Sequence, residues 1–271
     1  MKALLNKIFV PCAFLCVVST AQAVPVVVDA ANAPANGFSF NTTDNTGTPP
    51  GTGSLTFVNG PATPPAGIGS INLQTGPGAG DGAVQIRYNG FLGTTLASIT
   101  NLGYSTYATS IGGSQLPFMT VYVGNTGALG GGPNDRLFFE PVYSTAQGAI
   151  ALNTWQTWNV LTGNVIGDSF GPVPMSWAAY VAANPLAILI NDPNPIFAGT
   201  GGIRLSSGNS NPGDNVNTNV DNFIINGFEY NFEVNATPEL DPGNLGLPLF
   251  LTIGTLLLLS HRKRRLPAVV G

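Results

Sequence analysis

Residues 226–234 read Asn-Gly-Phe-Glu-Tyr-Asn-Phe-Glu-Val, and this stretch decides the fold class. An Asn-Gly pair is a preferred centre for a two-residue β-hairpin turn, because both residues tolerate a positive φ. After the turn, apolar and polar side chains alternate without a break as far as Val234. A period of two is that of a strand with one face against a core and the other in water. The stretch therefore predicts a hairpin whose second strand is buried on one side.

Further strands are predicted upstream, between patches rich in glycine and proline. The chain has 35 glycines and 22 prolines, and they gather in patches such as 48–53, 76–82 and 124–133 that read as turns. Short runs of β-forming residues lie between such patches. The predicted strands are 54–58, 83–88, 118–123, 137–139, 187–190 and 202–205.

The run 83–88 shows the alternation most clearly. Val84, Ile86 and Tyr88 alternate with Gln85 and Arg87. We expect the apolar set to face the core and the polar pair to face water.

One short helix is predicted after residue 176. Ser176 is a suitable N-cap, Trp177, Tyr180 and Val181 fall on one helical face, and Pro185 ends the helix. Many short strands with glycine-rich turns and little helix are typical of two packed sheets. The predicted fold class is therefore all-β: a jelly-roll-like, two-sheet antiparallel β-sandwich with one short helix, plus a carboxyl-terminal transmembrane helix.

The amino-terminal residues 1–23 have the pattern of a secretory signal peptide. Lys2 and Lys7 flank the start of an apolar stretch over 8–18, and Ala21 and Ala23 supply the small residues that signal peptidase requires. The apolar stretch is too short to span a hydrocarbon core of roughly 30 Å. We expect cleavage before Val24 and an extracellular domain over 24–236.

The carboxyl-terminal residues 237–271 contain a second membrane element. Residues 245–260 are almost wholly apolar, and the basic cluster 261–265 follows at once. Basic residues stay on the cytoplasmic side of a membrane helix, so the domain is expected outside. A buried core helix, the alternative, does not explain the terminal position or the basic cluster.

Pro238, Glu239 and Leu240, followed by this apolar helix and by Arg262, Lys263, Arg264 and Arg265, resemble the PEP-CTERM sorting tail of exported bacterial proteins. The resemblance covers about the last 35 residues, and Leu240 replaces the usual second proline. It implies an exosortase-type sorting enzyme as a partner, with cleavage near Pro238. It also implies an address at the cell envelope, the cell surface or the extracellular matrix. A simple stop-transfer helix, which would anchor the protein stably, is the rival interpretation.

The composition of the middle segment restricts what it can bind. Between residues 24 and 237 there is no lysine, histidine or cysteine, and eleven acidic residues face three arginines, a formal charge of about −8. Nucleic-acid binding is excluded because it needs clustered basic residues. An anionic polysaccharide is disfavoured without a bridging cation. Arg87, Arg136 and Arg204 are too far apart in sequence to form a motif, and Arg136, next to Asp135, reads as a surface ion pair.

The same composition excludes most classes of enzyme. Serine and cysteine hydrolases, most zinc sites and Schiff-base enzymes need a histidine, cysteine or lysine. A carboxylate pair such as Glu140 and Glu229 is the remaining option, as in glycoside hydrolases, but no local motif marks either residue. We therefore predict that the protein is not an enzyme and has no catalytic residues.

The segments 137–143, 153–158 and 219–223 look like a recurring domain of exported bacterial proteins that is similar to carbohydrate-binding jelly rolls. That domain has no established activity. The resemblance implies a structural calcium site that includes Asp221.

The residues around Asp221 point independently to calcium. Asp214, Asn217, Asn219 and Asp221 supply side-chain oxygens, and the last three would line one face of an extended segment. Calcium takes six to eight oxygen ligands. Turns rich in asparagine also occur without metal, so both interpretations stay open.

Trp155 and Trp158 are candidates for stacking against sugar rings. Three residues apart, they do not share a face of one regular strand, so at least one is expected in the core. Two functions follow: a non-catalytic surface or matrix protein linked to exopolysaccharide or biofilm, and a carbohydrate-binding module or adhesin. A carboxylate-dependent glycoside hydrolase is third.

Overall fold

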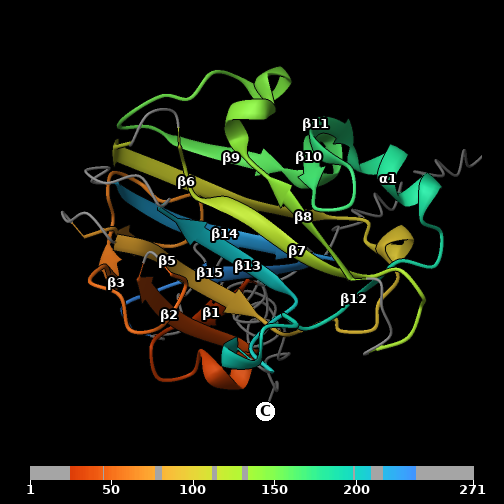
Figure 1. Ribbon diagram of the computed structural model, residues 1–271. Helices are drawn as coiled ribbons and strands as arrows, with labels where there is room; N and C mark the ends of the chain where they lie inside the picture. The colour runs from red at the N-terminus through yellow and green to blue at the C-terminus, as the bar shows by residue number, and fades with distance from the viewer. Residues whose placement is uncertain are drawn as a thin grey trace, which may run out of the picture.

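A computed structural model describes residues 25–44, 46–76, 81–111, 115–129, 134–197, 199–208 and 216–235. This part of the chain is mostly β, with two sheets and one α-helix (Figure 1). The predicted signal peptide, the predicted membrane helix over 245–260 and the sorting motif lie outside these residues. Within the described segments, no helix has both the length and the apolar character needed to cross a membrane.

The first sheet has seven strands, with β14 at its centre. One side of β14 pairs with β6, which in turn pairs with β9. Along its other side, β14 pairs first with β4, which leads to β3, and then with β15, which leads to β1. The strands are β1 Val26–Val28, β3 Ser54–Asn59, β4 Gly69–Gln74, β6 Leu102–Ser110, β9 Trp155–Asn159, β14 Asn217–Ile225 and β15 Phe228–Phe232.

The second sheet has eight strands in the order β11-β10-β8-β7-β13-β5-β2, and β12 pairs with the end of β7. The strands are β2 Phe38–Asp44, β5 Asp81–Tyr88, β7 Phe118–Gly124, β8 Asn134–Phe139, β10 Asn164–Gly167, β11 Gly171–Ser176, β12 Ile188–Leu189 and β13 Ile203–Ser207. Short 3₁₀ helices in the connections are η1 Pro34–Asn36, η2 Leu96–Ser98, η3 Pro141–Tyr143, η4 Thr145–Gln147, η5 Val160–Thr162 and η6 Pro195–Phe197.

The two sheets pack face to face around one apolar core. Phe38 of β2 makes edge contacts with Phe223 and Phe232 of the other sheet, at ring-centroid distances of 5.9 and 5.3 Å. The hydroxyls of Tyr88 and Tyr230 are hydrogen-bonded across the sandwich at 2.7 Å. Aromatic rings and aliphatic side chains from both sheets thus supply the burial that holds the domain together without disulfides.

The local predictions from sequence are confirmed. Each of the six predicted runs overlaps a strand, although only Ile188 and Leu189 of the run 187–190 are in one, and Asn226-Gly227 form the hairpin turn with φ values of 48° and 82°. The helix α1 Trp177–Ala183 starts where expected, because the Ser176 side chain accepts a hydrogen bond from the Ala179 backbone N–H. One pair departs from the expected antiparallel pattern: β1 runs parallel to β15.

The polar faces of two strands, which were expected to be exposed to solvent, are buried, so this prediction is wrong. On β5, Gln85 and Arg87 are as inaccessible as their apolar neighbours. Asn231 of β15 and Glu233, which directly follows this strand, are buried, while Phe228 stays half exposed. Two connections cause this: segment 191–201 covers part of the outer face of the eight-stranded sheet, and loop 60–68 covers part of the other.

Loop 60–68 is held by two buried carboxylates at a fork in the seven-stranded sheet. Asp221 lies where β4 and β15 leave β14, and its carboxylate accepts from the backbone N–H groups of Ala66 and Phe232, both at 3.1 Å. Glu233 accepts from the Ile68 N–H at 2.8 Å. A Cβ on Gly67 would lie 1.8 Å from the Glu233 carboxylate, so only glycine fits there. Burial raises the pKa of Asp221 to about 7.

The raised pKa of Asp221 predicts how stability depends on pH. Between about pH 4 and pH 7 the folded state binds a proton more tightly than the unfolded chain, so the free energy of unfolding falls as the pH rises through this window. The fall attributable to Asp221 is at most about 4 kcal/mol. Urea denaturation of the wild type and of Asp221→Asn from pH 4 to pH 8 measures it, and the variant should lack this fall.

Asp44→Asn is the matched control, because Asp44, at the end of β2, accepts hydrogen bonds from the exposed turn that follows it and its pKa is not raised. This variant should keep the fall of the wild type. Identical pH profiles for the wild type and Asp221→Asn would contradict the assignment.

Candidate functional site

The two predicted tryptophans point in opposite directions from β9. Trp158 is completely buried, and its indole N–H donates to the Thr106 hydroxyl at 2.8 Å. Trp155 lies on the outer face, partly exposed, with its ring centroid 5.6 Å from that of Tyr107. Trp158 therefore belongs to the core, and Trp155 is the one available to a ligand.

Trp155 is also attached to loop 60–68. Its indole N–H donates to the Pro61 carbonyl at 2.9 Å, which ties the ring to the segment that Asp221 and Glu233 hold from the other end. The position of the ring thus depends on the fork in the sheet.

A row of polar side chains lies on the same outer face as Trp155. The Asn72 side-chain amide donates to the side-chain oxygens of Asn217 at 2.7 Å and of Asn219 at 3.1 Å. Asn219 in turn donates to the Ser70 hydroxyl at 2.9 Å. Amide groups next to an aromatic ring can orient the hydroxyls of a bound sugar.

The predicted calcium ligands are only partly described. Asn217, Asn219 and Asp221 do lie at alternate positions of β14, but their oxygens already accept hydrogen bonds from protein N–H groups. Asp214 lies outside the described residues. Among the residues that are described, no group of three or more histidine, cysteine, aspartate or glutamate side chains is placed to hold a metal. Calcium binding therefore stays a prediction, with no geometric support from the described ligands.

The two glutamates considered for catalysis lie in different sheets. Glu140 directly follows β8 and is partly buried, which raises the pKa of its carboxyl. Glu229 is on β15. No contact joins the two within the described structure.

The three arginines of the domain lie on neighbouring strands, contrary to what their spacing in sequence suggested. Arg87 of β5 is directly opposite Arg204 of β13, which is opposite Thr120 of β7. Arg136 of β8 is opposite Tyr122 of the same β7. All of them alternate with core residues, so they share the outer face of the eight-stranded sheet. Pairing in the sheet, which the sequence does not display, produces this cluster.

Arg87 is completely buried, and segment 191–201 covers it. Its Nη1 forms an ion pair with Asp192 at 2.8 Å, its Nε donates to Gln85 at 2.9 Å, and its guanidinium lies 3.7 Å above the centre of the Phe197 ring. Asp192 also accepts a hydrogen bond from Tyr122, whose pKa is raised to about 12, chiefly by burial. Asp192 and Phe197 carry no sequence motif, and only the fold identifies them as partners of Arg87.

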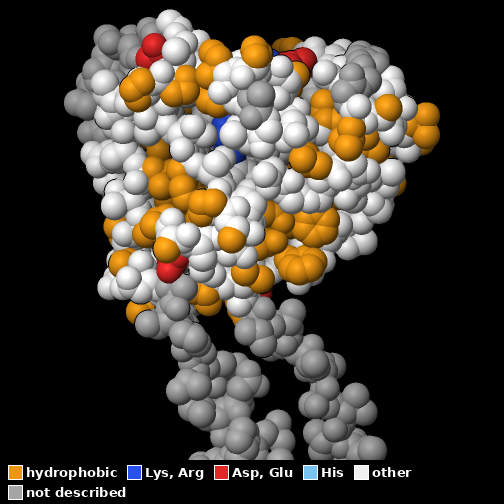
Figure 2. All heavy atoms as spheres, turned by 90° about the horizontal axis from the view of Figure 1, so that it is seen from below, with side chains coloured by type: hydrophobic (Ala, Val, Ile, Leu, Met, Phe, Trp, Pro, Cys, Tyr) orange, Lys and Arg blue, Asp and Glu red, His pale blue; other side chains and the backbone are white. Residues whose placement is uncertain are grey.

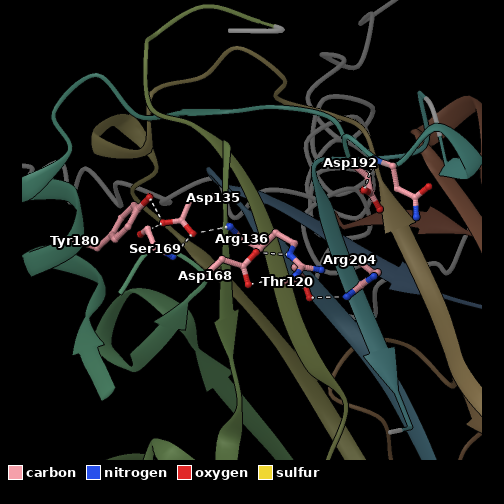
Figure 3. A network of polar contacts seen from close by, with 9 residues as sticks. Thr120, Asp135, Arg136, Asp168, Ser169, Tyr180, Asp192 and Arg204 are labelled. Carbon is pink, nitrogen blue, oxygen red and sulfur yellow. Dashed lines mark hydrogen bonds and ion pairs between the residues drawn. The ribbon is translucent and has the colours of Figure 1, made fainter. Parts of the chain in front are cut away.

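The rest of the network runs along the same sheet (Figure 3). Arg204 donates to the Thr120 hydroxyl at 3.2 Å. Arg136 pairs with Asp168, both half exposed, and not with the adjacent Asp135 as the sequence suggested. Asp135 points to the opposite side of β8, where it accepts hydrogen bonds from Ser169 and Tyr180. The ion pair predicted at Arg136 is present, but with a different acid.

No family model, curated protein or solved structure matches this chain. The geometry of the two outer faces is therefore the basis for a functional assignment.

The two ion pairs differ in burial, which predicts different costs when they are broken. Asp192→Asn leaves the Arg87 guanidinium buried without its counter-charge, so it should lower the free energy of unfolding by about 3 kcal/mol or more. Asp168→Asn, at the exposed pair, is the matched control and should cost less than about 1 kcal/mol. Urea denaturation at pH 7 measures both. Equal losses for the two variants would contradict the burial argument.

Proposed function

We propose that this chain is a non-catalytic protein of the bacterial cell surface or extracellular matrix, exported through its amino-terminal signal and sorted by its PEP-CTERM-like tail. The domain between the two ends would be jelly-roll-like in topology. Its partners would be an exosortase-type enzyme, the membrane through the carboxyl-terminal helix, and an exopolysaccharide.

The observation that carries the non-catalytic part of the proposal is the use of the carboxylates in the fold. Every aspartate whose side chain the structure describes, together with Glu233, accepts hydrogen bonds that shape a turn, a loop or an ion pair. These residues are Asp29, Asp44, Asp135, Asp168, Asp192, Asp221 and Glu233. With no lysine, histidine or cysteine between residues 24 and 237, few groups are left to transfer protons.

Removal of residues 237–271 tests whether the carboxyl-terminal tail retains the protein at the cell envelope. The truncated protein should be exported and released into the medium, whereas the complete chain should be retained at the envelope in a host that has an exosortase. Cell fractionation with immunoblotting separates the two outcomes. Replacement of Arg262, Lys263, Arg264 and Arg265 by glutamine is a second variant that keeps the apolar helix and should also be missorted.

Mass spectrometry of the envelope form locates its carboxyl terminus. An end near Pro238 is expected, and an intact Arg265 would contradict processing in favour of a stop-transfer helix. A cytosolic complete chain would contradict the whole proposal.

A carbohydrate-binding module is a second candidate function, and one specific observation favours it. Trp155 is partly exposed next to Tyr107, on the face that also carries Asn72, Asn217 and Asn219. An aromatic ring beside amide groups is a suitable surface for a sugar ring and its hydroxyls.

Trp155→Ala should weaken binding to a glycan identified on a glycan array by up to about 10-fold, because the stacking surface is lost. Trp155→Phe keeps a ring but loses the hydrogen bond to Pro61, so it should retain part of the affinity. Tyr143→Ala, which removes another half-exposed aromatic residue, is the control and should bind as the wild type does. Unchanged binding by folded Trp155→Ala would exclude this face.

A further inference from the structure

Arg204 is the one arginine of the cluster without a carboxylate partner among the described residues. Arg87 pairs with Asp192 and Arg136 pairs with Asp168, so the three arginines face two acids in this network. One positive charge is therefore left over on the outer face of the eight-stranded sheet, in a domain whose formal charge is otherwise strongly negative. The excess lies beside β5 and β13, where Arg87 and Arg204 are direct neighbours.

Buried hydrogen-bond donors in the same place have no acceptor. Arg204 Nε, Arg87 Nη2 and Ser206 Oγ are inaccessible to solvent and lack a partner within the described structure. Arg87 and Arg204 are opposite each other, and Ser206 follows two residues further along β13, opposite Gln85. Side chains at such positions lie roughly 5 Å apart. An unsatisfied buried donor costs about 1 to 3 kcal/mol, so these three leave positive charge poorly compensated beneath the partly exposed Arg204 side chain.

The acceptor that fits best is negatively charged. Two guanidinium groups lie side by side, and Asp192 already pairs with one of them and accepts from Tyr122. Burial lowers the pKa of Arg204, and the nearby charge of Arg87 also lowers it, whereas Tyr122 and Asp192 raise it. Guanidinium groups bind oxyanions through paired N–H donors.

The surroundings favour an oxyanion attached to a ring. Figure 2 shows basic side-chain atoms recessed in a hollow between neutral and hydrophobic surface. The Tyr122 ring lies 5.7 Å from Arg204 Cζ, and the Phe138 ring lies 5.4 Å from Arg136 Cζ. Tyr122 is buried and closed to a ligand, but Phe138 is partly exposed. Phe138, Thr120 and Arg204 are opposite one another on adjacent strands, so a sugar ring over Phe138 could present its acidic group to the Arg204 guanidinium.

We propose that the partly exposed Arg204 guanidinium binds the carboxylate of a uronic acid residue in an acidic polysaccharide, with the buried Arg87 beside it as a second positive charge. The proposal goes beyond the carbohydrate-binding candidate above, because it places a separate site on the other sheet and names its ligand class. It also reverses the expectation, drawn from the net charge, that acidic polysaccharides are disfavoured.

Isothermal titration calorimetry of the complete purified protein with galacturonic acid trimer tests the site. Its fully methyl-esterified form, which is neutral, and inorganic sulfate are the comparison ligands. The acidic trimer should bind, the ester should bind at least about 10-fold more weakly, and raising the salt concentration should weaken only the acidic ligand. Arg204→Gln should reduce the affinity for the acidic trimer by at least about 10-fold.

Two further variants test whether a loss of binding is specific to the Arg204 guanidinium. Arg204→Lys keeps the charge but loses the paired donors of the guanidinium, so its affinity should lie between those of the wild type and Arg204→Gln. Glu229→Gln, which removes a charge from β15 of the other sheet, is the control and should stay within about twofold of the wild type. Circular dichroism and the melting temperature verify that each variant is folded.

Equal binding of the acid and the ester, or no loss in folded Arg204→Gln, would overturn the proposal. Inorganic sulfate binding as tightly as the trimer would overturn the sugar assignment. If neutral glycans bind and the loss appears only in Trp155→Ala, this inference fails while the carbohydrate-binding proposal stands.

Discussion

The hydrogen bonds of Asp221 and Glu233 hold the seven-stranded sheet together where it divides. β4 and β15 both pair with β14, and the two carboxylates satisfy the backbone N–H groups that this fork would otherwise leave unpaired. They also fix loop 60–68 over the outer face, and that loop fixes the Trp155 ring through Pro61. The more open of the two candidate binding faces thus depends on acids that are themselves sealed from solvent.

On the opposite sheet the buried charged group is an arginine, and a covering segment compensates its charge. Segment 191–201 brings Asp192 and Phe197 over Arg87, and the ion pair and the ring compensate a guanidinium that solvent does not reach. Its neighbour Arg204 receives no such compensation from the described residues. The sandwich therefore has one outer face organised around buried acids and another organised around an excess of arginine. These arrangements explain how a domain with so few charged residues can have distinct surfaces.

The sequence predicted what is local and failed where a distant segment covers a strand. The Asn226-Gly227 turn, the Ser176 cap and the apolar members of β5 depend on neighbouring residues, and the structure has all three. Arg87 and Glu233 were expected to be exposed to solvent. The alternation of polar and apolar residues shows which side of a strand a residue is on, but it does not show whether another segment covers that side. The cluster of Arg87, Arg136 and Arg204 was missed because the order of strands in a sheet is not visible in sequence. At least one of Trp155 and Trp158 was expected in the core, and Trp158 is there.

In the proposed function, the termini carry the chain to the envelope, and the domain between them offers binding surfaces in place of catalytic groups. A crystal structure of the protein with bound galacturonic acid trimer is the most direct test. We expect a sugar carboxylate within hydrogen-bonding distance of the Arg204 guanidinium, with Asp221 and Glu233 still bonded to the backbone of loop 60–68. A trimer whose glycosidic bond lies between two carboxylates of the domain, or one that makes no contact with Arg204, would contradict this account.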